Sequence, residues 1–208
     1  MGRLSGSPTV QTLALMLVVS LLYWGVRTLA GFLPVVTGAS LFVLGPWFPS
    51  APWTLVTSVY AHAGVGHLVA NAITLAFAGL LLERSTTTVR YHTFFLATGI
   101  LAGLSQVVLN GGGGVLGASG AIFALIGYIV TANPISEVAL SRLRLTRGVQ
   151  VVVFAVLAVV VTVLTGGPGV ALYAHFAGLL VGLVAGRLHV LEPSTPASER
   201  SATSQYRV

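Results

Sequence analysis

Six apolar segments set what this chain of 208 residues can fold into. Each segment is close to the length of about 17 to 25 residues that a helix needs to cross a bilayer. Only 7% of the residues are charged, against about 25% in soluble proteins. We therefore predict an all-α membrane protein whose six transmembrane helices occupy residues 10–191. The segments are 10–26, 67–82, 91–109, 115–132, 148–164 and 170–188.

The first segment could be mistaken for a secretory signal, because Arg3 precedes it. Its apolar run is longer than the signal core of about 7 to 15 residues, and no clear Ala-x-Ala site follows, so we expect a retained helix. In a six-helix chain all arginines but Arg27 fall on one side. The positive-inside rule then predicts that both termini are cytoplasmic.

The net charge of +6 is interpreted as this orientation signal, because the arginines form no basic face that would suit nucleic acid. Residues 1–9 are expected to be a cytoplasmic N-terminus. Residues 192–208 are rich in Pro, Ser and Thr and are expected to be a disordered cytoplasmic tail.

The segment 31–66 is too apolar for a free loop and too interrupted by prolines for a straight helix. Tryptophan and tyrosine favour the membrane interface, so we expect this first outer loop to lie in the outer interface. A plain extracellular linker is the alternative. The aromatic residues concerned are Phe42, Trp47, Phe48, Trp53 and Tyr60.

Ser119 follows a run of glycines and begins an apolar stretch. Gly117 and Gly120 leave bare backbone on both sides of this serine, which opens a path for a carbonyl group and frees N–H groups that can bind an oxyanion. The alternative is a packing serine that bonds to a carbonyl one turn earlier or fills space at a helix contact. A phosphate loop is excluded, because no Gly-Lys-Ser/Thr sequence is present.

Polar side chains on three predicted helices share one depth. The segments 67–82, 115–132 and 170–188 all enter from the non-cytoplasmic side, so their first turns lie at the same level. Polar groups inside a membrane helix are costly to bury and are therefore functional candidates. Four such residues lie within roughly 10 Å of this entrance, at 1.5 Å of rise per residue. They are His67, Asn71, Ser119 and His175.

Histidine suits the role of a base for a serine hydroxyl near neutral pH. His175 is the better candidate, because Gly178 begins a glycine stripe on its face that lets another helix come close. His67 and Asn71 can donate hydrogen bonds to an oxyanion beside the Ser119 N–H. The chain has no aspartate, and every glutamate is expected on the cytoplasmic side. A Ser–His dyad is therefore predicted, without a carboxylate member.

These motifs resemble those of the rhomboid intramembrane serine proteases over about residues 53–186. Residues 117–120 look like the Gly-x-Ser-Gly nucleophile motif, and 174–182 look like the Ala-His-x-x-Gly-x-x-x-Gly base motif. Residues 62–71 resemble the His-x4-His-x3-Asn element, and 79–83 resemble the end of the second helix.

The resemblance implies a Ser119–His175 dyad and an oxyanion site formed by the Ser119 N–H, His67 and Asn71. It also implies hydrolysis of peptide bonds in or near transmembrane segments of other proteins, and a first outer loop that lies partly in the membrane. Supporting roles are expected for His62, Gly117, Gly120, Phe123 and Gly178.

Two positions depart from the family pattern. Thr54 stands where many relatives have arginine after a tryptophan. Phe123 stands where many have tyrosine, so the ring can pack on His175 but lacks a hydroxyl.

Two other functions compete with a protease. One is a catalytically silent rhomboid-like protein that only binds transmembrane helices. The other is a metal site or transporter built on His62, His67 and His175, which is disfavoured because no carboxylate is expected on the outer side.

We expect a multi-pass protein of the cell membrane whose site opens outward, with transmembrane substrates and lipid as partners and no metal, cofactor or nucleic acid. The sequence carries no signal for a particular substrate or oligomeric state.

Overall fold

The computed structural model describes residues 6–30, 39–133, 145–164, 166 and 169–192. Within these residues the secondary structure is helical, apart from one antiparallel bridge between Leu44 and Val115. The α-helices are α1 (Pro8–Ala30), α2 (Ala39–Phe42), α3 (Thr54–Tyr60), α4 (Val65–Leu82), α5 (Thr88–Leu109), α6 (Ser119–Thr131), α8 (Arg147–Leu164) and α9 (Leu172–Arg187). A short 3₁₀ helix, η1 (Glu83–Ser85), follows α4.

Each predicted apolar segment coincides with a helix. Among the described residues, α1, α4 together with η1, and α5 are long and apolar enough to cross a membrane. The helices α6, α8 and α9 are apolar but shorter. The predicted all-α membrane architecture is therefore present, and three helices meet the length expected of a full span.

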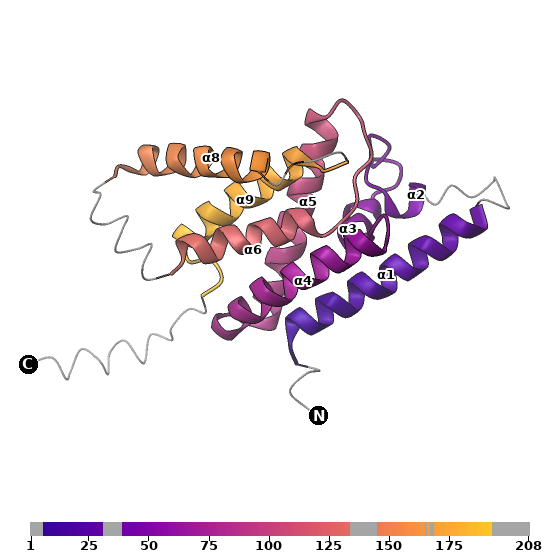
Figure 1. Cartoon of the computed structure of the whole chain (residues 1–208), viewed down its shortest axis with the longest axis horizontal. Helices are drawn as coiled ribbons and strands as arrows, with labels where there is room; N and C mark the ends of the chain where they lie inside the picture. Colours follow the sequence, from indigo (N-terminus) through magenta and orange to yellow (C-terminus); the bar gives the residue numbers. More distant parts are fainter. Residues whose placement is uncertain (1–5, 31–38, 134–144, 165, 167–168, 193–208) are drawn as a thin grey trace, which may run out of the picture.

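Helices α6 and α9 form the centre of the bundle and pack closely side by side (Figure 1). A Cβ atom at Gly178 would collide with the backbone of Gly120, and one at Gly182 would collide with the backbone of Ala124. The predicted glycine stripe of α9 therefore faces α6 and lets the two backbones touch, as small residues do in membrane helix pairs.

Helix α4 packs between α6 and α1, and α8 lies against α9 on the opposite side of the bundle (Figure 1). The core between α1, α4 and α5 contains large side chains that are fully buried, among them Met16, Leu75, Tyr91 and Phe95. The rings of Tyr91 and Phe95 stack with their centroids 6.4 Å apart. This packing fixes α4 relative to α1 and α5 and so fixes His67, the histidine that α4 carries.

The described part of segment 31–66 is folded against the loop that precedes α6. Leu44 and Val115 exchange backbone hydrogen bonds of 3.0 and 2.8 Å, and the N–H of Gly117 donates to the carbonyl of Ser58 at 2.8 Å. Thr54 is fully buried, and its Oγ1 donates to the Ala51 carbonyl at 2.7 Å. The segment therefore does more than connect α1 to α4, because it holds the backbone next to Ser119. Its location in the membrane interface stays a prediction.

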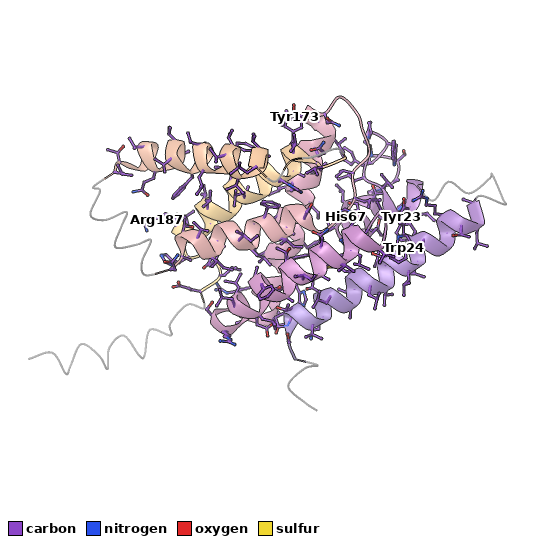
Figure 2. All side chains as sticks on the ribbon, in the orientation of Figure 1. Tyr23, Trp24, His67, Tyr173 and Arg187 are labelled. Atoms are coloured by element: carbon purple, nitrogen blue, oxygen red, sulfur yellow. The ribbon has the colours of Figure 1, made fainter. Side chains whose placement is uncertain are left out.

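Charged groups gather at the end of the bundle where α4 and α9 end and α1 and α5 begin. Glu83 accepts hydrogen bonds from Ser7 Oγ at 2.7 Å and from the Thr9 N–H at 3.1 Å, which ties the end of α4 to the start of α1. Arg90 donates to the carbonyls of Val190 and Glu192 at 3.0 and 2.8 Å. Arg187 ends α9, opposite Tyr173 near its start (Figure 2).

Several predictions of the sequence analysis fall outside the described residues. They concern Arg3, Glu137, Glu199 and most of the segments 1–9 and 192–208.

Candidate active site

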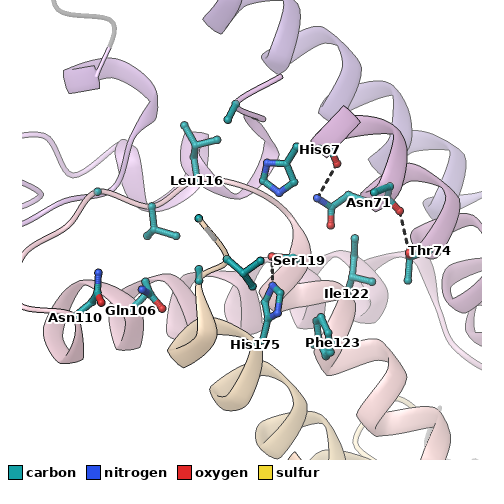
Figure 3. A pocket seen from close by; sticks show the side chains of 17 residues that line it. His67, Asn71, Thr74, Gln106, Asn110, Leu116, Ser119, Ile122, Phe123 and His175 are labelled. Carbon is teal, nitrogen blue, oxygen red and sulfur yellow. Dashed lines mark hydrogen bonds between the residues drawn. The ribbon is translucent and has the colours of Figure 1, made fainter. Parts of the chain in front are cut away.

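A cavity of about 900 Å³ lies where α4, α5, α6 and the start of α9 meet. Its lining includes the four side chains that the sequence analysis placed at one depth: His67, Asn71, Ser119 and His175 (Figure 3). The structure thus brings together residues of three helices, and the first and last of them, His67 and His175, are more than 100 positions apart in the sequence.

Ser119 is the first residue of α6, and its Oγ lies 3.0 Å from Nε2 of His175. This distance is within the range for direct proton transfer between a hydroxyl and a base. The hydroxyl has no other hydrogen-bond partner among the described residues. A serine at the start of a helix also has no helical turn before it, and Ser119 Oγ bonds to no backbone carbonyl among the described residues. Its role as a nucleophile stays a prediction.

The second nitrogen of His175, Nδ1, is buried and has no hydrogen-bond partner in the part of the chain that the structure describes. The described glutamates lie elsewhere: Glu83 at the end of α4, roughly 24 Å from His67 at 1.5 Å per residue, and Glu192 beyond the end of α9. Among the described residues the arrangement therefore has two members and no carboxylate beside the base. Phe123 stacks on the imidazole of His175 with centroids 4.3 Å apart, as its position in the sequence suggested.

His67 and Asn71 face the same cavity from α4. Gly117 has a φ of +126°, and a Cβ there would lie 2.7 Å from Cε1 of His67, so the glycine gives the imidazole its space beside Ser119. Asn71 Nδ2 donates to the carbonyl of His67 at 3.0 Å. Both side chains are within the site, and their role at an oxyanion stays a prediction.

His62 lies behind the cavity and is fully buried. Its Nε2 accepts a hydrogen bond of 3.4 Å from the N–H of Ala118, next to Ser119. Its Nδ1 lies 3.0 Å from the Tyr60 carbonyl and 3.1 Å from Ser20 Oγ, so the tautomer that fits carries its proton on Nδ1.

His62 belongs to the short connection between α3 and α4. Burial, with a smaller contribution from His67, lowers the pKa of His62 to about 4. The ring is therefore neutral at neutral pH and can accept the Ala118 N–H. His62 thus contacts the backbone next to Ser119, and its supporting role in the site stays a prediction.

Sequence reasoning missed three residues near the site. Ser20 contacts the His62 ring, and Trp24 Nε1 donates to the His62 carbonyl at 2.8 Å. Gln106 Oε1 accepts from the N–H groups of Tyr173 and Ala174, at the start of α9. Gln106 could have been flagged as a polar side chain inside an apolar segment. Ser20 carries a weaker signal, because serine is common in membrane helices.

Comparison with known families identifies the fold. The model of the Rhomboid domain matches residues 49–191, more than half of the chain. This chain belongs to the rhomboid family. It is therefore an integral membrane protein, and the matched region includes the serine, both site histidines and the asparagine described above.

The rhomboid chain is similar to several curated relatives. It is 30% identical to RHOMBOID-like protein 4 of Arabidopsis thaliana over 142 residues, which are 68% of this chain and 35% of the relative. It is 30% identical to RHOMBOID-like protein 7 of the same plant over 141 residues, 68% of this chain and 44% of the relative. Rhomboid-like protease 3 of Toxoplasma gondii is 27% identical over 131 residues, 63% of this chain and 49% of the relative. The matches thus span about a third to a half of the length of these relatives.

In the described part of the rhomboid chain, no three His, Asp or Glu side chains lie where they could share a metal ion.

Proposed function

We propose that this rhomboid protein is an intramembrane serine endopeptidase that hydrolyses peptide bonds in or near the transmembrane segments of other membrane proteins. The observation that carries the proposal is the 3.0 Å contact between Ser119 Oγ and His175 Nε2 at the wall of a large cavity. A similarity to a relative named as a protease supports it.

The proposed reaction begins when Ser119 Oγ attacks the scissile carbonyl carbon and His175 Nε2 takes the hydroxyl proton. The oxyanion that forms is stabilised by the Ser119 N–H, with His67 and Asn71 as further donors from α4. His175 then gives the proton to the leaving amine. His175 then takes a proton from a water molecule, whose oxygen attacks the acyl-enzyme. As the acyl–oxygen bond breaks, His175 returns the proton to Ser119 Oγ and the new carboxyl end is released.

The proposal includes a six-helix topology in the cell membrane, with cytoplasmic termini and a cavity that opens to the outer side. The charges at the far end of the bundle support it, because Arg84, Arg90 and Arg187 all lie at helix ends remote from Ser119. The chain contains no cysteine, so a single introduced cysteine reports the side of the membrane on which its position lies. Single cysteines at Ser5, Gly113 and Ser198 are expected to react with an impermeant maleimide in intact cells only at position 113. Labelling at 5 or 198 would overturn the topology.

The chemical proposal is tested with a serine-reactive fluorophosphonate on the purified chain. Labelling is expected in the parent and not in Ser119→Ala, together with cleavage of a transmembrane substrate by the parent alone. A parent that binds transmembrane helices without reacting with the probe or cleaving them would instead be a silent, helix-binding rhomboid. If Ser119→Ala still cleaves the transmembrane substrate, the serine-protease mechanism is wrong.

A further inference from the structure

The first turn of α9 determines where His175 lies, because this histidine is only the fourth residue of the helix. Helices usually begin with a Ser, Thr, Asp or Asn whose side chain accepts the free N–H groups of the first turn. In α9 the residue at that position is Ala171, which has no side-chain oxygen and makes no capping bond. The N–H groups at the start of α9 therefore need an acceptor from elsewhere.

Gln106 of α5 is that acceptor. Its Oε1 accepts hydrogen bonds from the N–H of Tyr173 at 3.0 Å and of Ala174 at 3.2 Å. These are the second and third residues of α9, whose N–H groups a capping side chain ordinarily binds. The neighbouring Ser105 Oγ donates to the Tyr173 carbonyl at 3.1 Å. Two adjacent side chains of α5 thus hold the first turn of α9 from a distance of 67 positions in the sequence.

The imidazole of His175 has little else to orient it. In a serine–histidine–carboxylate triad the base is held through its second nitrogen. Here Nδ1 has no partner among the described residues, and the stacking of Phe123 fixes the plane of the ring but not its height along α9. The height of His175 relative to Ser119 must therefore come from the backbone of the first turn.

We propose that Gln106 is a positioning residue that caps α9 and thereby holds His175 Nε2 in reach of Ser119. The proposal rests on the proposed function, since it concerns the base of the proposed dyad. The amide oxygen carries this role. The amide nitrogen, which has no hydrogen-bond partner in the described chain, is not needed for it. Gln106 is 7% exposed and borders the cavity, so a contact with substrate is the competing role (Figure 3).

Two substitutions separate these roles. Gln106→Glu keeps an oxygen that can accept both N–H groups and removes the amide donor, whereas Gln106→Met keeps the length and removes the acceptor. The measurement is the rate of Ser119 labelling by a fluorophosphonate in the full chain in detergent, as a function of probe concentration. Misplacing a reacting group by about 1 Å can cost about 10²-fold, so we expect the maximal rate of Gln106→Met to fall about tenfold or more. Its half-saturating probe concentration is expected to stay near that of the parent.

Rescue by the conservative variant decides the mechanism. Gln106→Glu is expected to label within about threefold of the parent, because charge-assisted acceptance of N–H groups is at least as strong as the amide contact. Equal losses in both variants would assign the effect to the amide nitrogen and overturn the proposal, as would a parent rate in Gln106→Met. Thr98→Val is the matched control on α5, because the Thr98 hydroxyl bonds only to carbonyls of its own helix, and it is expected to label like the parent.

If Gln106→Met does not fold, as judged by thermal unfolding, Gln106→Asn decides, because its shorter side chain draws the amide oxygen back from the N–H groups of Tyr173 and Ala174 but keeps an amide. Its labelling is expected to slow about two- to threefold, as for the loss of one weak hydrogen bond, and a parent rate would overturn the proposal. A parent chain that is not labelled at all would overturn the proposed function, and the role of Gln106 with it.

Discussion

Gly178 of α9 packs directly against the carbonyl group of Gly120 in α6, so that a side chain at position 178 would meet backbone. Gly120 follows Ser119, and Gly178 lies three residues after His175 on the same face of its helix. The closest approach of the two helices therefore lies within one turn of both reacting groups. The distance between α6 and α9 at this point controls the distance between Ser119 Oγ and His175 Nε2.

The first prediction follows from this contact. Gly178→Ala is expected to push α6 and α9 apart, because a helix backbone cannot rotate away as a side chain can. The unfolding free energy is expected to fall by about 1 to 3 kcal/mol, as for other overpacked sites. Substrate turnover per folded molecule is expected to fall by up to about 10²-fold, since the base is displaced from the serine. Thermal unfolding and a cleavage assay measure the two effects.

Two other glycines serve as controls for Gly178→Ala. A Cβ at Gly186 would meet the backbone of Tyr128, so Gly186→Ala is expected to lower stability similarly but to affect turnover less, because it lies far from the dyad along α9. A Cβ at Gly148 meets nothing within 4 Å, so Gly148→Ala is expected to change neither. Equal turnover losses at 178 and 186 would contradict a local effect on the dyad.

A second prediction concerns the two members of the dyad. Ser119→Ala, His175→Ala and the double variant are expected to lose the same activity, because residues that act as one unit are strongly non-additive when removed. Glu192→Gln is the control, since the Glu192 carboxylate contacts His189 beyond the end of α9, away from the dyad. This variant is expected to keep full turnover. Losses that add up in the double variant would show that the two residues act independently.

Local sequence patterns predict the helices and much of the site. Hydrophobic length places every predicted segment on a helix. The spacing of Gly178 and its successors predicts that another helix packs closely there, and the structure shows that this helix is α6. The motif residues at 119 and 175 come together because three helices begin at one end of the bundle. These features depend on periodicity, which a single sequence displays.

The contacts of Ser20, Trp24 and Gln106 at the site could not be predicted, because they depend on pairings between distant segments. Nothing near Gln106 in the sequence indicates that its amide meets Tyr173, and nothing near Ser20 indicates the ring of His62. The fold of segment 31–66 against the loop before Ser119 is likewise set by backbone hydrogen bonds to a distant strand-like stretch, which side-chain patterns do not encode.

A third prediction tests the oxyanion donors. Asn71→Ala removes one donor that faces the cavity, and the loss of one such donor costs about 2.7 to 4 kcal/mol, or about 10² to 10³ in rate. Turnover is expected to fall by up to that amount but to remain measurable, because His67 and the Ser119 N–H persist. His67→Ala is expected to behave similarly. Unchanged turnover in both single variants would remove the two residues from the site.

The last prediction uses the pH dependence of His62. Its folded-state pKa of about 4 lies below the ordinary value of about 6.5, because burial disfavours the charged ring. Between these values the unfolded chain binds a proton at His62 that the folded chain does not, so stability rises with pH in this range. Stability from a neutral His62 is therefore complete above about pH 6.5 and is lost progressively as the pH falls towards 4.

His62→Gln cannot titrate, so its thermal unfolding temperature is expected to fall less than that of the parent between pH 7.5 and 4.5. The variant is expected to be less stable at pH 7.5, because contacts with Ser20 and the Ala118 N–H are weakened. The difference between the two curves isolates His62 from the other histidines, which are unchanged. Parallel curves for parent and variant would show that His62 binds its proton equally well in the folded chain, and that a neutral ring is not what holds the backbone beside Ser119.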